Sequence, residues 1–303
     1  MSGAYSANPR CPHGGVLGLR YVFRVVVKRG ELTGQVAVVT GAGSGIGRST
    51  ALLLARLGAA VYVADLNGEA ADAVSAEIAA LGGRATAHAV DVTEPASVEA
   101  LAERVFSVDG GVDLLHNNAG GGHAGPFEET SLDEWQRVLA VNLMGVVHGI
   151  HAFVPRMLGQ GRPAHVVNTA SMAGLVAVAE MAPYCTSKHA VVGLSESLNS
   201  ELSPRGIHVT ALCPGIIDTP LIPAAHLEGH LARRRSRIER FYTRFGSSPD
   251  VVAEALVDAV RRKQLIRTVP RHHVVAGWLL RRLSPRLAQP LARLNTRLVA
   301  GGR

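Results

Sequence analysis

The sequence predicts an α/β protein in which a single doubly wound domain has a seven-stranded parallel sheet with helices on both faces. Of its 303 residues, 47% are hydrophobic and 18% are charged, so the chain can bury a sizeable core. From Gln35 onward, short β-branched runs alternate with longer helical patterns, which is typical of a parallel sheet covered by helices. No internal repeat or low-complexity linker divides the chain.

The expected elements follow one another in strict alternation. Strands are expected at Val36–Thr40, Ala60–Ala64, Ala85–Ala89, Asp113–Asn117, His165–Thr169, His208–Cys213 and Ile266–Val269. Helices are expected at Gly45–Leu57, Gly68–Leu81, Pro95–Phe106, Leu132–Met157, Pro183–Leu202 and Pro249–Arg262. The strands are short and rich in Val and Ala, whereas the helices are longer and carry apolar residues three or four apart.

Four segments are distinguished by composition. Residues 1–31 form a basic N-terminal extension, and residues 32–270 form the α/β domain. Within the domain, a lid is expected at about residues 216–246, where the regular alternation is interrupted. Residues 271–303 form a basic tail with a leucine stripe that Pro285 and Pro290 interrupt. Such a stripe needs a partner, which is either a sister subunit, the lid or an anionic membrane.

Charge and composition exclude several classes of protein. The net charge is +7, but residues 226–303 hold 17 basic and 5 acidic side chains while the middle of the chain is acidic. This pattern is not the even basic face of a nucleic-acid binder. No apolar run reaches the roughly 18 residues of a membrane span. Three scattered cysteines favour a reducing, cytoplasmic location, with peripheral membrane association through the basic tails as the alternative.

Metal and hydrolase chemistry are not indicated. His148 and His151 lie three residues apart on an expected helix but lack a third ligand, so no metal site is predicted. His272 and His273 are expected at the surface. The Gly-x-Ser-x-Gly pattern of a serine hydrolase is absent from the sequence.

A glycine-rich turn follows the first strand. The run Gly41-Ala42-Gly43-Ser44-Gly45-Ile46-Gly47 leads directly into an apolar helix. Glycine lets the backbone approach a pyrophosphate closely, and the helix N-terminus offers unpaired N–H groups with a positive dipole end. Gly47 would let the helix and strand pack closely. A dinucleotide site is therefore expected here.

Asp65 follows the second strand, where a carboxylate can bind the adenosine ribose hydroxyls. It would repel a 2′-phosphate, and Leu66 offers no positive charge, so NAD is favoured over NADP. Two alternatives remain open. Asp65 could be an ordinary loop or capping carboxylate, and Arg48 could reach a phosphate and admit NADP.

A serine, a tyrosine and a lysine form the catalytic candidate. Ser171 follows the fifth strand, and Tyr184 and Lys188 share one face of a helix because they are four residues apart. An ammonium beside a phenol favours the phenolate and lowers the phenol pKa from about 10. A tyrosine so placed could exchange protons near neutral pH.

With these motifs the chain closely resembles the short-chain dehydrogenase/reductase family, over roughly residues 32–269. The resemblance rests on Thr40-Gly41-x-x-x-Gly45-Ile46-Gly47, Asp91-Val92, Asn117-Asn118-Ala119-Gly120, Asn142, Ser171, Tyr184-x-x-x-Lys188 and Pro214-Gly215 with Thr219. All are present in order, and none departs from the family pattern. The resemblance implies a Rossmann-type fold and an NAD(P)-dependent oxidoreductase.

The resemblance also implies a role for each residue. Tyr184 would be the acid/base and Ser171 would hydrogen-bond the substrate oxygen. Lys188 would bind the nicotinamide ribose, and Asn142 would hold a water that links Lys188 to solvent. The remaining cofactor contacts would come from Gly41, Ser44, Gly45, Ile46, Gly47, Asp65, Asp91, Val92, Asn118, Ala119, Gly120, Pro214, Gly215, Ile217 and Thr219.

The expected activity is interconversion of a secondary alcohol and a ketone, with NAD as cofactor and a small hydrophobic, lipid-like or steroid-like substrate. The lid supports this choice because it begins apolar and becomes basic at Arg233–Arg235 and Arg237. The alternatives are an NADP-dependent carbonyl reductase and a non-catalytic dinucleotide-sensing scaffold. The family commonly forms homodimers or homotetramers, so an oligomer is expected as well.

Overall fold

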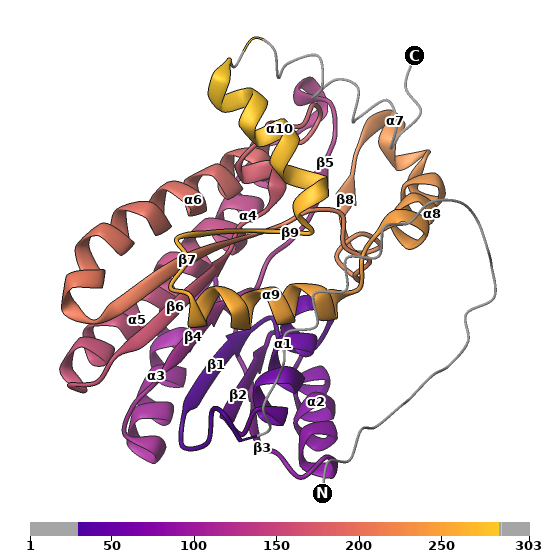
Figure 1. Ribbon diagram of the computed structural model, residues 1–303. Coiled ribbons are helices and arrows are strands. Elements are labelled where there is room, and N and C mark those ends of the chain that lie inside the picture. Colours follow the sequence, from indigo (N-terminus) through magenta and orange to yellow (C-terminus); the bar gives the residue numbers. More distant parts are fainter. Residues whose placement is uncertain (1–29, 285, 287–303) are drawn as a thin grey trace, which may run out of the picture.

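The parallel sheet is the centre of the protein. In a computed structural model, which describes residues 30–284 and residue 286, the main strands are β1 (Val36–Thr40), β2 (Ala60–Asp65), β3 (Arg84–Ala89), β4 (Leu114–Asn117), β6 (Ala164–Thr169), β7 (Ile207–Pro214) and β9 (Ile266–Val269). They form one sheet in the order β3-β2-β1-β4-β6-β7-β9, and every neighbouring pair is parallel (Figure 1). The predicted seven-stranded sheet is confirmed.

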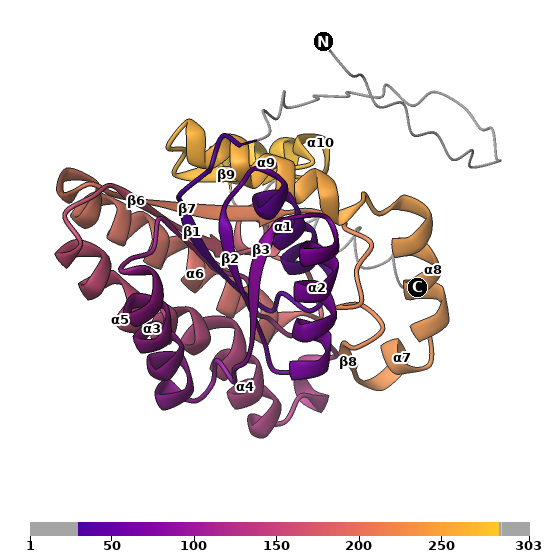
Figure 2. The ribbon, with the colours of Figure 1, turned by 90° about the horizontal axis from the view of Figure 1, so that it is seen from below.

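Helices cover both faces of this sheet (Figure 2). One face carries α1 (Gly45–Arg56), α2 (Gly68–Ala80) and α9 (Pro249–Arg261), and the other carries α3 (Pro95–Asp109), α5 (Gly145–Gly159) and α6 (Ala182–Leu202). Strands such as β1 and β6 are buried along their whole length because helices pack on them from both sides. The nearly continuous apolar sequence of β1 has this cause.

The strand order reverses between β1 and β4. From β1 the chain moves outward through β2 and β3, then returns to β4 on the other side of β1. In doubly wound sheets, ligands bind in the crevice at this reversal, outside the carboxyl ends of the strands. The glycine turn follows β1 at this edge.

The helix expected at Leu132–Met157 contains an irregularity that the sequence did not indicate. It begins as α4 (Leu132–Leu139) and continues as α5, but a π-helical turn at Ala140–Met144 separates the two. There the N–H of Gly145 donates to the carbonyl oxygen of Ala140, five residues back. Single π turns of this kind occur frequently at functional sites. Asn142, at the centre of this turn, is fully buried.

The same helical run is apolar enough to be compared with a membrane span. Leu132–Gly159 has a mean hydropathy of 1.6 over its most apolar window, and 44% of that window is buried. Length and composition alone would allow it to cross a bilayer. Phe153 and Met157, however, belong to the core between α5, α3 and the sheet, so in this structure the run is a core helix.

The lid is a separate excursion at the carboxyl edge of the sheet. It contains β8 (His226–Leu227), α7 (Gly229–Ala232) and α8 (Arg235–Phe245). An isolated bridge between Ile217 and Ser247 brings its two ends together. Strand β8 pairs in parallel with β5 (His123–Ala124), which follows β4. This pairing joins the lid to the segment after β4. These two-residue strands are too short for sequence periodicity to reveal.

The segment expected as a tail begins as part of the domain. Its first residues form α10 (Arg271–Leu283), whose Val274 is buried against the core and whose Trp278 packs on the same cluster. The expected extension before residue 30 and the leucines at 287, 291, 294 and 298 lie outside the described residues. Membrane attachment and the homodimer or homotetramer therefore stay predictions.

Gly47→Ala is expected to destabilise the protein. A Cβ at this position would lie 2.1 Å from the carbonyl oxygen of Gly41, which is backbone and cannot rotate away. Overpacking of this kind costs about 1–3 kcal/mol. Gly193→Ala, on the open side of α6 with nothing within 4 Å of the added Cβ, is the matched control and should gain roughly 0.5–1 kcal/mol. Urea unfolding measures both, and equal stabilities would contradict the close-packing argument.

Candidate active site

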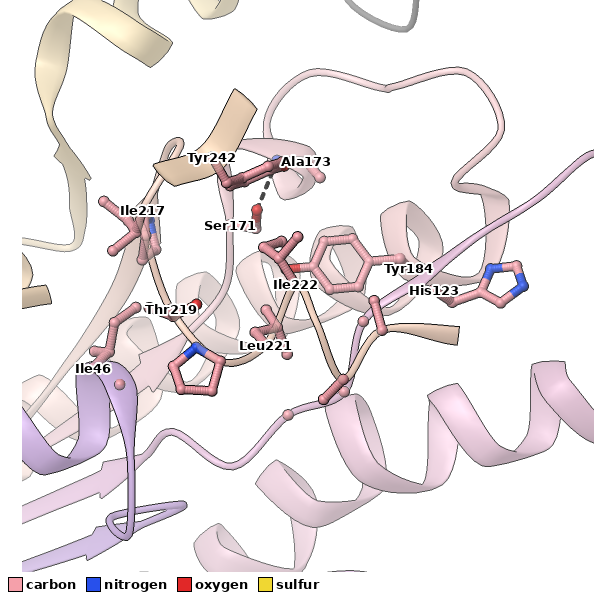
Figure 3. Close-up of a pocket in the computed structure, with 18 of the residues that line it drawn as sticks. Ile46, His123, Ser171, Ala173, Tyr184, Ile217, Thr219, Leu221, Ile222 and Tyr242 are labelled. Atoms are coloured by element: carbon pink, nitrogen blue, oxygen red, sulfur yellow. Dashed lines mark hydrogen bonds between the residues drawn. The ribbon is translucent and has the colours of Figure 1, made fainter. Parts of the chain in front are cut away.

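A large cavity lies at the carboxyl ends of the strands. Its volume is about 1350 Å³, and its walls come from the loops after β1, β2, β4, β6 and β7 and from the lid. Figure 3 shows Ile46 at one end and Ser171 and Tyr184 further along, with lid residues Leu221 and Ile222 facing them. One cavity thus joins the glycine turn to the catalytic candidates.

Asn118 holds the glycine turn in shape. Its amide nitrogen donates to the carbonyl oxygens of Thr40 and Gly41, at 3.1 Å each. Its backbone N–H donates to the Thr40 hydroxyl at 2.9 Å. Gly41 and Gly45 have φ angles of +60° and +52°, in the left-handed region that favours glycine. The side chain of Asn118, expected to line a cofactor ribose, is thus engaged with the turn itself.

The N-terminus of α1 is open to the cavity. Ser44 is its N-cap but makes no side-chain capping hydrogen bond, whereas Asn67, Ser131 and Ser248 cap α2, α4 and α9. The first turn of α1 has no acidic residue. Unpaired N–H groups and the positive dipole end are therefore available to an anion. The geometry fits the pyrophosphate of a dinucleotide.

Asp65 lies in the cavity wall beside the glycine turn. Its Oδ2 accepts the N–H of Gly43 at 2.8 Å, and its Oδ1 accepts the N–H of Asn67 at 2.9 Å. A carboxylate has about four acceptor sites, so two remain for ribose hydroxyls. Leu66 is 72% exposed beside it and brings no charge. Arg48, the alternative phosphate contact, forms an ion pair with Glu77.

Most of the predicted cofactor residues lie in the cavity wall. They are Gly41, Ser44, Gly45, Ile46, Asp65, Asp91, Val92, Asn118, Ala119, Gly120, Pro214, Gly215, Ile217 and Thr219, together with Ser171, Tyr184 and Lys188. Gly47 and Asn142 are the two that lie behind the wall. Gly47 packs against Gly41, and Asn142 is fully buried.

Ser171, Tyr184 and Lys188 meet in one part of the wall. Ser171 caps a 3-10 turn at Met172–Gly174, where its hydroxyl accepts the N–H of Ala173 at 3.1 Å (Figure 3). Lys188 donates from Nζ to the carbonyl oxygen of Thr169 at 2.8 Å, and its Nζ lies 5.8 Å from the centre of the Tyr184 ring. All three side chains are buried.

The expected lowering of the Tyr184 pKa is not what the structure shows. Burial raises the pKa of Tyr184 to about 12, the Ser171 hydroxyl acts in the opposite direction, and Tyr242 and Cys185 raise it further. Burial also lowers the pKa of Lys188 to about 8. Desolvation of the charged form therefore outweighs the influence of the ammonium on the phenol, and the closed cavity favours a protonated tyrosine.

Asn142 acts behind the catalytic wall. Its Oδ1 accepts the N–H of Gly121 at 2.7 Å, while its Nδ2 donates to the carbonyl oxygen of Gly121 at 3.0 Å and lies 3.3 Å from the Ser187 hydroxyl. The side chain thereby ties the loop after β4 to the residue before Lys188. Its expected part in holding a water stays a prediction.

Sequence analysis missed three residues of this site. Thr169 accepts from Lys188 through its carbonyl oxygen, and its hydroxyl donates to Oδ1 of Asn118 at 3.3 Å. Tyr242 reaches the cavity from α8. His273, expected at the surface, lines the cavity instead, and its Nδ1 accepts the N–H of Ile216 at 3.2 Å. No sequence motif marks these positions, which are recognised only once the lid and α10 are in place.

Among the residues that the structure describes, no group of three or more His, Cys, Asp or Glu side chains could hold a metal ion. His148 instead hydrogen-bonds through Nδ1 to the carbonyl oxygen of Val92 at 2.8 Å.

Comparison with known proteins agrees with this site. A probable oxidoreductase of Mycobacterium tuberculosis, EphD, is 41% identical over 274 residues, which are 88% of this chain but 46% of that protein. The chain thus spans about half the length of such relatives. Cyclohexanol dehydrogenase of an Acinetobacter strain is 45% identical over 193 residues, covering 63% of this chain and 76% of that enzyme.

The solved structures give the same result. A short-chain dehydrogenase/reductase from Burkholderia phymatum, solved in complex with NAD, superimposes with a TM-score of 0.79 at 34% identity and covers 85% of this chain and 96% of its own. Residues 35–227 match the short chain dehydrogenase family. The match covers more than half of the chain and includes the glycine turn, Ser171, Tyr184 and Lys188. The chain belongs to the short-chain dehydrogenase/reductase family.

Proposed function

We propose that the protein is an NAD-dependent oxidoreductase that interconverts a hydrophobic secondary alcohol and its ketone. The observation that carries the proposal is the single cavity in which Ser171, Tyr184 and Lys188 face the same space as the open N-terminus of α1. An intact proton-transfer group argues against a sensing scaffold, which would have no need of it. We also propose that the enzyme is cytoplasmic and forms a homo-oligomer.

The residues of the chain would manage the proton of the reaction. In the oxidation direction, Tyr184 takes the proton of the substrate hydroxyl while Ser171 donates a hydrogen bond to the same oxygen. A bound nicotinamide supplies the acceptor for the hydride that leaves the carbinol carbon. Lys188, with its pKa near 8, can relay the proton onward. In the reduction direction, the protonated Tyr184 is already the required acid.

The cofactor preference rests on charge at the adenosine end. Asp65 places a carboxylate in the cavity wall, and Arg48, the alternative phosphate contact, forms an ion pair with Glu77. A 2′-phosphate there would meet the negative charge of Asp65. NAD is therefore the cofactor we propose.

The substrate class rests on the lid and on the named relatives. The cavity has an apolar wall that includes Leu221, Ile222, Ala224 and Leu227. Figure 3 shows Leu221 and Ile222 on the side that faces Tyr184. Among the relatives, cyclohexanol dehydrogenase is named for an alicyclic secondary alcohol. We therefore propose a secondary alcohol whose reacting part is apolar and alicyclic.

Tyr184→Phe should abolish turnover while leaving cofactor binding nearly unchanged, because the substitution deletes only the transferable proton. General acid–base groups contribute about 10²–10⁴-fold. The measurements are kcat for cyclohexanol oxidation and NADH affinity by fluorescence titration. A variant that kept more than about a tenth of wild-type kcat would show that another group transfers the proton.

Asp65→Asn should narrow the preference for NAD over NADP by about tenfold or more, which corresponds to about 1.4 kcal/mol. Asparagine keeps an oxygen acceptor for one of the two backbone N–H groups that Asp65 binds and removes the charge that repels a 2′-phosphate. Asp72→Asn, an exposed carboxylate on α2, is the control. The ratio of kcat/KM for the two cofactors is measured, and a wild-type enzyme that prefers NADP would overturn the assignment.

The two reaction directions should differ in pH dependence. Because the pKa of Tyr184 is raised to about 12, the phenolate needed for oxidation increases about tenfold per pH unit below that value. Oxidation kcat/KM should rise steadily through neutral pH and rise less steeply once Lys188 loses its proton above pH about 8. Ketone reduction, which needs the phenol, should stay flat over the same interval. Oxidation that is independent of pH below 8 would contradict this.

A further inference from the structure

Three arginines form a row along the lid helix α8. Arg237, Arg240 and Arg244 all line the cavity, and all are exposed. At 3.6 residues per turn they fall within about 60° of the helix circumference. Phe241 and Phe245 lie next to them around the helix and line the cavity too. Figure 1 shows α8 beyond the carboxyl edge of the sheet.

Acidic partners for this row are missing among the described residues. None of the three arginines takes part in an ion pair there. Arg240 donates from Nε to the carbonyl oxygen of Ser236 in its own helix at 3.2 Å, and the guanidinium of Arg244 lies 5.5 Å from the centre of the Phe245 ring. Glu239, the acidic residue of α8, lies on another side of the helix. By contrast, Arg235 braces the lid by donating to the carbonyl oxygens of Pro223 and Ala225.

The row does not stabilise the helix that carries it. Like charges three or four residues apart on a helix repel each other. The acidic residues of the cavity wall, Asp65 and Asp91, follow strands β2 and β3 at the glycine-turn end and do not neutralise the row. The lid side of the cavity is therefore positive, with aromatic rings beside the charges.

The helix α8 that carries the row lies beside Tyr184 and Ser171. Tyr242 of the same helix is close enough to Tyr184 to raise its pKa, and Figure 3 shows it on the same side of the cavity as Ser171 and Ala173. Around α8, Tyr242 lies about 140–200° from the three arginines, so these side chains are on opposite sides of a helix whose diameter with side chains is about 10 Å. Phe241 and Phe245 lie between them around the helix. A substrate held at Tyr184 would therefore reach the arginines only with a group at least about 10 Å from its reacting carbon.

We propose that the Arg237, Arg240 and Arg244 face of α8 binds an anionic group of the substrate, so that the enzyme acts on apolar secondary alcohols carrying a carboxylate or phosphate. Guanidinium groups bind both anions through paired N–H donors. The inference rests on the proposed function and specifies its substrate class. The apolar body of the substrate would contact the lid between Tyr184 and the row.

The test compares acids with neutral analogues of the same shape. The probes are secondary hydroxycarboxylates of increasing chain length, each with its methyl ester, assayed with NAD. The acid should exceed its ester in kcat/KM by about tenfold, through KM, with an optimum at intermediate length, and rising salt should reduce this ratio. A secondary alcohol of the same chain length that carries a terminal phosphate monoester in place of the carboxylate distinguishes a carboxylate site from a phosphate site.

Substitution of the row identifies the groups responsible. Arg237→Gln, Arg240→Gln and Arg244→Gln should each lower the acid-to-ester ratio, and the triple variant should bring it to about one. Arg233→Gln is the matched control, since Arg233 is an exposed lid arginine outside the cavity wall. It should leave the ratio at the wild-type value.

Two results would overturn the inference while leaving the proposed function intact. Equal turnover of acid and ester in the wild type would show that the row recognises no substrate anion. A triple variant in which KM for NAD rises, with the acid-to-ester ratio unchanged, would assign the row to the cofactor phosphates. Absence of turnover with every alcohol, cyclohexanol included, would instead reject the proposed function and the inference together.

Discussion

A continuous set of hydrogen bonds connects the two ends of the site, and it runs through Asn118. The Asn118 amide donates to the carbonyl oxygens of Thr40 and Gly41, which shapes the glycine turn. Its Oδ1 accepts from the hydroxyl of Thr169, whose carbonyl oxygen accepts from Lys188. The set crosses β1, β4 and β6 and ends on α6. The distance between the nucleotide end and the catalytic end is therefore determined by the neighbouring strands β1, β4 and β6.

Burial has opposite effects on the two titrating groups at the catalytic end. It raises the pKa of Tyr184 and lowers the pKa of Lys188, so both shifts favour the uncharged side chain. The expectation that the ammonium would dominate came from sequence spacing, which gives the proximity of the two groups but not their desolvation. Desolvation depends on the lid, since Tyr242 and the apolar residues around it close the cavity over Tyr184.

The sequence predicted those features that follow from local pattern. Strands β1 and β2 are nearly continuous apolar runs, and the glycine turn and Tyr184-x-x-x-Lys188 are short motifs, so all could be placed without coordinates. The π turn at Ala140–Met144 could not, because it lacks a proline and depends on Asn142 binding Gly121 across the core. The sequence also could not predict that the arginines of α8 line the cavity. Periodicity shows that they share one face of the helix, but it does not show which part of the protein that face contacts.

The bridge between Ile217 and Ser247 has a consequence for how such a protein can change. Because the lid leaves and re-enters the fold at adjacent points, its length and content can vary without moving β7 or α9. The pairing of β5 with β8 would orient a replacement segment through backbone groups alone, whatever its side chains. The apolar wall from Leu221 to Leu227 and the group Ser171, Tyr184 and Lys188 thus come from separate segments of the chain, so an exchanged lid would present a different wall to these three residues while their own backbone positions are kept.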